Sequence, residues 1–329
     1  MRIVRRDVLR FAAAAAVVPA LPRIVRAQGS PQAYPIRPVR LIVGFPPGGG
    51  TDVAARLMGQ WLSERLGQPV LVENRPGAGS NIATEAVVRA AADGHTLLLV
   101  STAHAINATL YDRLTYNFMR DIAPVAGFMR VANAMVINPS LPVGSIPEFI
   151  AFARSNPGKV NMGSGGIGTA QHLSGEMFKM MAGLDIVHVP YRGAAPALTD
   201  LIGGQVQAMF GDMPSSLEFI RAGKLRALGV TAAARSEALP DVPTVGEFLP
   251  GYESSAWYGL GAPRGTPRDI VEGLNADINA ALRDAKMQAR LAALGGTALE
   301  GSSSDFSKLI ADETDKWAKV VKFSGAKVE

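Results

Sequence analysis

Two glycine-rich segments of this 329-residue chain have the composition of anion-binding loops. The first spans residues 44–52 (GFPPGGGTD), and the second spans residues 163–169 (GSGGIGT). Each follows a short apolar run and precedes a pattern with helical spacing. The free N–H groups at a helix N-terminus, together with the positive end of the helix dipole, attract anions. Two such turns therefore predict two lobes that face one small anion.

The first segment contains three consecutive glycines, which let the backbone approach a ligand closely because they lack side chains. Thr51 can cap the following helix, and Asp52 is favourable in its first turn. A tight strand-to-helix turn without a ligand is the structural alternative. We favour a ligand site, since three glycines in a row cost conformational entropy that a bare turn does not require. Replacing Gly49 or Gly168 by a bulky β-branched residue is expected to abolish binding and leave the fold intact.

The second segment also matches the G-x-G-x-x-G fingerprint of dinucleotide sites at residues 163–168. That fingerprint expects an acidic residue at the end of the next strand, to bind the ribose. Here Arg192 follows the next expected strand, where it could meet a phosphorylated ribose. An exported NADP-dependent oxidoreductase is therefore an alternative function. Neither loop ends in Gly-Lys-Ser/Thr, which argues against nucleoside triphosphate chemistry.

Further polar side chains follow other expected strands, at the end where open α/β sheets bind ligands. They are Ser101 and Thr102, then Tyr191 and Arg192, then Asp212. Arg192 can form a charge-assisted hydrogen bond to a carboxylate. Asp212 can bind a ligand hydroxyl or amine, or it can cap the helix that follows.

His172 and Tyr258 complete the candidate ligand contacts. His172 lies in the first turn of the helix after the second loop, where it faces either the ligand or solvent. Tyr258 lies on the segment that returns to the first lobe, where it either walls the cleft or packs in the core.

The remaining chemistry-bearing residues do not form an enzyme site. The four histidines have no metal-ligand spacing, and the chain has no Gly-x-Ser-x-Gly motif. The absence of cysteine excludes disulfides and thiol catalysis. We therefore expect a binding protein that is not an enzyme and uses no cofactor or metal.

The elements that position these residues alternate between strand and helix, which is typical of an α/β fold. In the first part, strands are predicted at 39–45, 70–73 and 96–101, with helices at 52–66 and 81–92. A second series has strands at 132–137, 160–162, 186–189, 207–210 and 226–230, with helices at 146–155, 171–181 and 216–222. An extended segment at 255–261 and helices at 268–283, 285–294 and 305–323 follow. We expect the chain to cross between two lobes near 124–139 and 239–251.

The charge is concentrated at the N-terminus. The chain has 33 basic and 28 acidic residues, and residues 1–27 contain six arginines and one acid, which leaves 27 of each sign. The neutral remainder argues against a nucleic-acid or membrane surface. Residues 5–10 (RRDVLR) precede a short apolar run at 11–21, which resembles a twin-arginine export signal cleaved after Ala27. A flexible cytoplasmic N-terminus is the alternative.

Taken together, these motifs resemble those of the Bug-type periplasmic receptors, the substrate-binding proteins of tripartite tricarboxylate transporters. Besides residues 44–52, the matching motifs are ENRPGAG (73–79), DGHTL (93–97), GGIGT (165–169) with His172 and Leu173, VPYRG (189–193), Gly211-Asp212 and LPDVPT (239–244). They cover the chain after the signal in the same order. The twin-arginine signal departs from the secretion signal that is commoner in this family.

The resemblance implies a two-lobed Venus-flytrap fold of type II that closes on a small carboxylate and passes it to the membrane subunits of a transporter. Lobe 1 would comprise residues 34–127 and 257–329, and lobe 2 residues 128–256. The implied partners are a di- or tricarboxylate, an acidic amino acid or an aromatic carboxylate, and the implied state is a periplasmic monomer. A sensor without a transport role remains an alternative. The implied ligand contacts are Phe45, Gly48, Gly49, Gly50, Thr51 and Asp52 on one side, Gly166, Ile167, Gly168 and Thr169 on the other, and Ser101 and Thr102 at the floor.

Overall fold

The structure is a computed structural model that describes residues 34–328. The expected signal peptide and its cleavage after Ala27 lie outside the described residues. Within residues 34–328, no helix combines the length and the apolar composition needed to cross a bilayer.

The first part of the chain forms parallel strands joined by helices, as predicted. Strand β1 lies between β2 and β3 and is parallel to both. Most residues of β1 and β3 are buried, which is usual where both faces of a parallel sheet are covered. The elements are β1 (Val39–Val43), α1 (Gly50–Leu66), β2 (Val70–Asn74), a 3₁₀ turn (Ala78–Ser80), α2 (Asn81–Val88), β3 (Thr96–Ser101), α3 (Thr102–Leu110) and α4 (Phe118–Asp121).

A second strand-and-helix series follows, and its strands β5, β6 and β7 are again parallel. Its elements are α5 (Ile146–Ser155), β5 (Asn161–Ser164), α6 (Ala170–Ala182), β6 (Val187–Pro190), α7 (Ala194–Ile202), β7 (Ala208–Asp212), α8 (Met213–Arg221), β8 (Arg226–Val230) and a 3₁₀ turn (Val245–Glu247). The predicted α/β class is therefore confirmed. The sequence analysis assigned no helix to α3 or α7.

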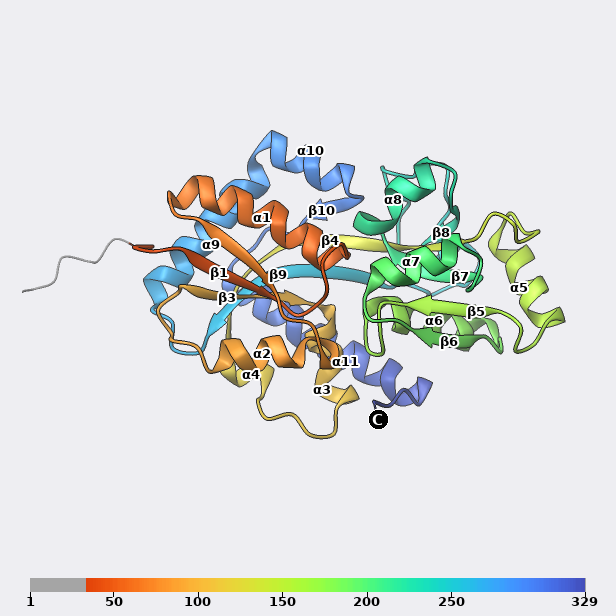
Figure 1. The fold of residues 1–329 in the computed structure, drawn as a ribbon, viewed down its shortest axis with the longest axis horizontal. Coiled ribbons are helices and arrows are strands. Elements are labelled where there is room, and N and C mark those ends of the chain that lie inside the picture. Colours follow the sequence, from red (N-terminus) through yellow and green to blue (C-terminus); the bar gives the residue numbers. More distant parts are fainter. Residues whose placement is uncertain (1–33, 329) are drawn as a thin grey trace, which may run out of the picture. The chain divides into compact units, whose positions relative to one another are not determined.

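Two long strands connect the two series, and Figure 1 shows them side by side as β4 (Ile122–Ile137, yellow) and β9 (Ser255–Pro263, cyan). Residues 122–132 of β4 pair with β9, and residues 133–137 pair with β7 and β8. Only residues 132–137 were predicted as strand. Pro124 and Gly127 obscured the rest, because both are poor strand residues; each lies beside a register shift in the pairing with β9, where such residues are tolerated.

The chain returns to the first series just after the proline-rich stretch 239–251. Val245 and Tyr252 pack in the same buried cluster as Phe149 and Phe178, so this stretch belongs to the second series. The N–H of Ser254 then donates to the carbonyl of Thr231, and β9 begins at the next residue. Strand β9 therefore begins just before residue 257, where lobe 1 is expected to resume.

The C-terminal part covers the first series with α9 (Arg268–Arg283), α10 (Ala285–Ala293), β10 (Gly296–Ala298) and α11 (Ser303–Ser324). Helix α11 packs against α3 and contributes Trp317, which is fully buried. The carboxylate of Glu313 accepts from the indole N–H groups of Trp317 at 2.8 Å and of Trp257 in β9 at 3.2 Å. This buried acceptor satisfies two donors that the core could not otherwise pair.

Candidate functional site

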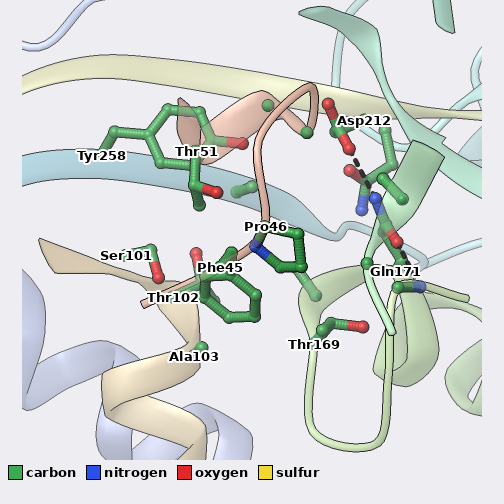
Figure 2. A pocket seen from close by; sticks show the side chains of 18 residues that line it. Phe45, Pro46, Thr51, Ser101, Thr102, Ala103, Thr169, Gln171, Asp212 and Tyr258 are labelled. Carbon is green, nitrogen blue, oxygen red and sulfur yellow. Dashed lines mark hydrogen bonds between the residues drawn. The ribbon is translucent and has the colours of Figure 1, made fainter. Parts of the chain in front are cut away.

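A cavity of about 60 Å³ lies where the N-termini of several helices converge. Its lining includes the first residues of α1, α3, α6 and α7, and also Asp212, which caps α8. In Figure 2, Tyr258, Thr51, Ser101 and Thr102 face Thr169, Gln171 and Asp212 across the loop that carries Phe45 and Pro46. Because a helix N-terminus presents free N–H groups and a partial positive charge, the convergence favours an anion.

The first glycine loop leaves a run of amide groups free at this cavity. The N–H of Gly48 donates to Asp52 Oδ2 at 3.0 Å. For the N–H groups of Gly49, Gly50 and Thr51, no acceptor is found within the part of the chain that the structure describes. All three residues line the cavity. They supply the donors that the sequence analysis expected from this loop.

Asp52 holds the loop in shape and does not line the cavity. Its carboxylate accepts from Gly48, from Arg56 Nε at 3.0 Å and from Asn74 Nδ2 at 3.0 Å. Burial acts to raise the pKa of Asp52, but these hydrogen bonds and the Arg56 charge lower it below its ordinary value. The ionised carboxylate of Asp52 therefore stabilises the loop that presents these N–H groups.

The second glycine loop uses its own amides internally. Gly165 N–H donates to Gln171 Oε1 at 2.6 Å, Gly166 N–H to Ser164 Oγ at 3.2 Å, and Gly168 N–H to His172 Nδ1 at 3.2 Å. The N–H of Thr169 donates to the carbonyl of Gly166 at 3.3 Å.

The donors at the start of α6 therefore lie later in the chain than the predicted set, Gly166 to Thr169. Ala170 and Gln171 are the first two helical residues, and both line the cavity. Thr169 lines the cavity too, but as the helix cap: its Oγ1 accepts from His172 N–H at 3.2 Å. The loop's glycines shape the turn, and the helix that they introduce presents the amides.

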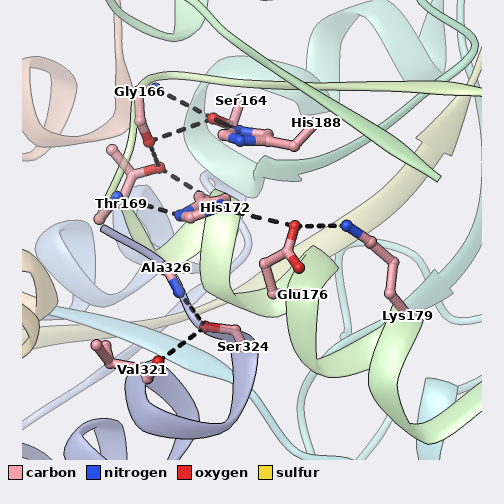
Figure 3. A network of polar contacts seen from close by, with 11 residues as sticks. Ser164, Gly166, Thr169, His172, Glu176, Lys179, His188, Val321, Ser324 and Ala326 are labelled. Carbon is pink, nitrogen blue, oxygen red and sulfur yellow. Dashed lines mark hydrogen bonds and ion pairs between the residues drawn. The ribbon is translucent and has the colours of Figure 1, made fainter. Parts of the chain in front are cut away.

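His172 supports the second loop from behind, and Figure 3 shows its network. Its Nδ1 accepts from Gly168, and its ring stacks on His188 with 4.0 Å between the centroids. His188 Nε2 in turn lies 2.7 Å from Ser164 Oγ, which contacts both the N–H and the carbonyl of Gly166. The side chain of His172, which was expected to face ligand or solvent, is thus buried, and it stabilises the second loop.

Burial sets the protonation of both histidines. Burial, with the nearby His188 and Lys179, lowers the pKa of His172 to about 3. Burial and the Lys179 charge lower the pKa of His188 to about 4. Both rings are therefore neutral at neutral pH, which lets His172 Nδ1 accept the Gly168 hydrogen bond.

The fold also brings together potential metal ligands that sequence spacing did not reveal. Ligand atoms of His172, Glu176 and His188 all lie within 4.8 Å of one another. Each of these side chains already has a protein partner, and Glu176 pairs with Lys179 Nζ at 2.9 Å. The i,i+4 spacing of His172 and Glu176 was visible in the sequence, but the approach of His188 from β6 required the fold.

Asp212 caps α8, which is one of the two roles that the sequence left open, and it also lines the cavity. Its Oδ1 accepts from Ser215 N–H at 3.2 Å and from Ser215 Oγ at 2.8 Å. Its Oδ2 accepts from the side-chain amide of Gln171. Burial raises the pKa of Asp212, although these hydrogen bonds favour its ionised form.

Gly50 lets the first loop lie directly against Asp212 and Tyr258, because glycine has no Cβ. A Cβ at Gly50 would lie 2.7 Å from Tyr258 Oη and 2.8 Å from Asp212 Cγ, and closer still to Asp212 Oδ1. Burial, with a contribution from the Asp212 charge, raises the pKa of Tyr258 well above its usual value, so its hydroxyl is protonated. The backbone of the first loop at Gly50 therefore lies directly against Asp212 and Tyr258.

A wider chamber of about 560 Å³ adjoins the inner cavity and shares Phe45, Pro46 and Thr169 with it. Four predicted contacts line only this chamber: Gly166, Ile167, Tyr191 and Arg192. Arg192 is exposed there, and Tyr191 Oη donates to Asp200 Oδ2 at 2.7 Å. Of the other predicted contacts, Gly48, Asp52, Gly168 and His172 line neither space.

Sequence reasoning missed about half of the inner wall. The residues that it did not name are Pro46, Ala103, Asn133, Gly165, Ala170, Gln171, Gly193, Ala194 and Ala256. Most lie at the starts of α3, α6 and α7, and two of those helices were not predicted. A search of the residues that follow every expected strand would have found Ala103 and Ala194. Asn133, in the middle of a strand, carried no such signal.

Comparisons with known proteins show the family and the fold of this chain. Residues 54–325 match the family described as "Tripartite tricarboxylate transporter family receptor" (TctC). Protein BugT of Bordetella pertussis is 40% identical over 308 residues, which are 93% of this chain and 94% of that protein. The solved structure of R. palustris Rpa4515 with adipate has a TM-score of 0.87 at 39% identity and covers 89% of this chain and 98% of its own.

A second solved structure, MatC from Rhodopseudomonas palustris with bound malate, has a TM-score of 0.83 at 34% identity and covers 88% of this chain and 100% of its own. These likenesses confirm the two-lobed fold of periplasmic binding proteins, with two connections between the lobes. The matched region begins just after the first glycine loop and contains the second loop and the whole of the second series. The chain therefore belongs to the TctC family of tripartite tricarboxylate transporter receptors.

Proposed function

We propose that this chain is a periplasmic receptor that captures a small carboxylate between its lobes and delivers it to the membrane subunits of a tripartite tricarboxylate transporter. One observation carries the proposal: the first residues of α1 and α6 line the same cavity, and within residues 34–328 no acceptor is found for the N–H groups of Gly50, Thr51, Ala170 and Gln171. Among the described residues that line it, none is a lysine or arginine. Helix N-termini and hydroxyl groups can bind a carboxylate without such a cation.

The lobes in this proposal comprise residues 34–127 with 257–329, and residues 128–256. Because α1 and α6 belong to different lobes, a carboxylate that accepts from both stabilises the closed arrangement. Closure is then a shift between two populations, and the closed form presents a surface that the transporter recognises. Adipate and malate bound to two family members support a small carboxylate. The receptor would act as a monomer and without a catalytic role.

The proposed contacts fall into two groups. Phe45, Gly49, Gly50, Thr51, Ser101, Thr102, Thr169, Asp212 and Tyr258 surround the carboxylate end, together with Ala170 and Gln171. Gly166, Ile167, Tyr191 and Arg192 would meet the part of a longer ligand that extends into the outer chamber.

The oxidoreductase alternative loses support from the second loop. A dinucleotide fingerprint needs its glycine amides free for the pyrophosphate. Here the amides of Gly165, Gly166 and Gly168 already donate within the protein. Absorbance and fluorescence of the purified protein test this alternative directly, since a bound nicotinamide cofactor has its own spectrum.

A thermal-shift screen tests the receptor proposal. Small carboxylates are added to protein that begins at residue 28 and has been stripped of ligand by partial unfolding. A ligand at about 100 times its Kd adds roughly 2.7 kcal/mol, which raises the melting temperature by several degrees. If no carboxylate shifts the melting temperature, the proposal fails.

Two cellular experiments test the transport role and the export route. Deleting the gene should abolish uptake of the carboxylate that the screen identifies, whereas a sensor would change gene expression and leave uptake intact. Replacing Arg5 and Arg6 by lysine should retain the protein in the cytoplasm if the twin-arginine route exports it. Normal export of that variant would count against this route.

A further inference from the structure

We infer that the ligand carries a hydrogen-bond donor, a hydroxyl or ammonium group, close to its carboxylate, and that Asn133 and Asp212 accept from this donor. The inference rests on the proposed carboxylate receptor and names the class of carboxylate that it takes. It starts from a buried carbonyl oxygen in the wall of the inner cavity.

Asn133 lies in β4 where the strand changes partners, and its side chain is fully buried. It lines the cavity, and within residues 34–328 its Oδ1 has no hydrogen-bond partner. Buried polar atoms in native proteins are almost always paired, so an unpaired one requires an explanation. A ligand donor supplies that explanation, because Asn133 lines the space where the ligand would lie.

The neighbouring hydroxyl groups fix which end of the Asn133 amide is the oxygen. Ser174 Oγ donates its hydrogen to the carbonyl of Ala170 at 2.7 Å. It can therefore only accept from Asn133, whose Nδ2 lies 3.0 Å away. Ser174 Oγ also lies 2.6 Å from Ser254 Oγ, which takes the other accepting position. The amide cannot turn over without losing a bond, so Oδ1 keeps its unpaired orientation.

Asp212 provides a second acceptor on the same face of the sheet as Asn133. Asn133 and Asp212 are directly paired across β4 and β7, so their side chains project from the same face of the sheet. Asp212 accepts three hydrogen bonds, from Gln171 Nε2 and from the N–H and Oγ of Ser215, all of which are uncharged. A carboxylate has about four accepting positions. The pair can therefore take one more donor between them.

The cavity thus has two chemically opposite ends. Free amides of α1 and α6 offer donors to a carboxylate, and Asn133 with Asp212 offers acceptors to a hydroxyl or ammonium group. Because the whole inner space is only about 60 Å³, the donor must lie on a carbon near the carboxylate. A ligand without a donor would leave Asn133 Oδ1 buried and unpaired, and would bring its own charge close to Asp212.

Matched ligands that differ at one carbon test the inference by calorimetry on stripped protein. The sets are propionate, lactate and alanine; succinate, malate and aspartate; and glutarate, 2-hydroxyglutarate and glutamate. Pairing a buried acceptor predicts that a hydroxy or amino member binds about 5- to 100-fold more tightly than its unsubstituted partner. The order of the hydroxy and amino members tells whether the donor is a hydroxyl or an ammonium group.

Two variants assign the effect to Asn133. In Asn133→Leu the preference for the donor-bearing member should fall to a few-fold or less. General damage would weaken all members in proportion and keep the ratio, so the ratio is the readout. Ser216→Ala is the matched control, because Ser216 Oγ is also buried and unpaired but does not line the cavity. Its ratio should equal that of the unchanged protein.

Each outcome bears on one proposal. Equal affinity for members with and without a donor, or an unchanged ratio in Asn133→Leu, overturns the inference and leaves the receptor proposal standing. Binding only of carboxylates that lack a donor has the same effect. If no carboxylate binds in these sets or in the wider screen, both the inference and the receptor proposal fail.

Discussion

Replacing Gly50 by alanine is expected to weaken ligand binding sharply without unfolding the protein. Gly50 is the first residue of α1 and has an ordinary backbone conformation, so alanine fits the helix. The added Cβ would collide with Asp212, whose carboxylate cannot move freely because Gln171 and Ser215 hold it. The closed arrangement must therefore open slightly or displace Asp212.

The magnitude follows from the hydrogen bonds that the displacement breaks. A hydrogen bond to a charged group contributes about 1.5–3 kcal/mol. If ligand binding requires closure, losing one such bond in the closed form weakens affinity by about 10- to 150-fold. Calorimetry with the tightest carboxylate from the screen measures this loss. Chemical denaturation of the ligand-free protein should show that Gly50→Ala costs much less than the lost binding energy.

Gly49→Ala is the matched control for this prediction. Gly49 is also in the first loop and lines the cavity, but a Cβ there would meet Ala194 Cβ at 3.7 Å, an ordinary contact. Its affinity should change by no more than a few-fold. Normal binding by Gly50→Ala would refute the close approach of the first loop to Asp212. A comparable loss in Gly49→Ala would mean that any added methyl group blocks the loop.

Four further predictions concern the supports of the site. His172 and His188 stay neutral in the folded protein below pH 6.5, whereas in the unfolded state they bind protons. The free energy of unfolding should therefore fall by up to about 2 kcal/mol per histidine between pH 6.5 and 5. Urea titrations measure this fall, and a flat pH profile would contradict the burial of the two rings. Gln171→Leu should lower the free energy of unfolding by about 1–3 kcal/mol, because it unpairs a loop amide, and an unchanged denaturation midpoint would count against that bond. Glu313→Leu should cost about 2–5 kcal/mol, because two buried indole N–H groups lose their acceptor, whereas Glu313→Gln should cost less in the same assay. Gly168→Val should impair folding as well as binding, because Gly168 has a φ of +79° and no room for a Cβ. This corrects the expectation from sequence that the fold would stay intact, and a normal melting temperature would refute it.

The elements with regular periodicity were predictable from sequence, and the irregular ones were not. Strands β3 and β8 and helices α5 and α9 have the predicted bounds. The first two-thirds of β4 was missed because proline and glycine are poor strand residues, and only pairing with β9 on one side and β10 on the other keeps it extended. Helix α7 was missed because its apolar sequence contains Pro196, which its first turn tolerates.

At the site, sequence identified the loops but not which of their amides remain free. That depends on caps and side-chain acceptors, such as Gln171 for Gly165 and His172 for Gly168, which approach only in the folded chain. Asp212 shows the same limit, since a helix cap and a cavity wall have the same sequence signal. Asn133 lies beyond that limit altogether, because no sequence pattern shows that a buried side-chain oxygen in the middle of a strand is left without a partner.

The distribution of charge in the cavity explains how binding and closure could be one event. Each helix N-terminus carries a partial charge of about +0.5, so neither α1 nor α6 alone balances a carboxylate. Together they do, but only when the two glycine loops approach each other as they do here. An open receptor would hold the anion on one loop with half of the compensation and full exposure to water. The absence of lysine and arginine from the described lining has the same consequence, since a flexible cation on one lobe could bind a carboxylate without requiring the other. In the proposed receptor, rigid amides on two lobes would make closure a condition of tight binding.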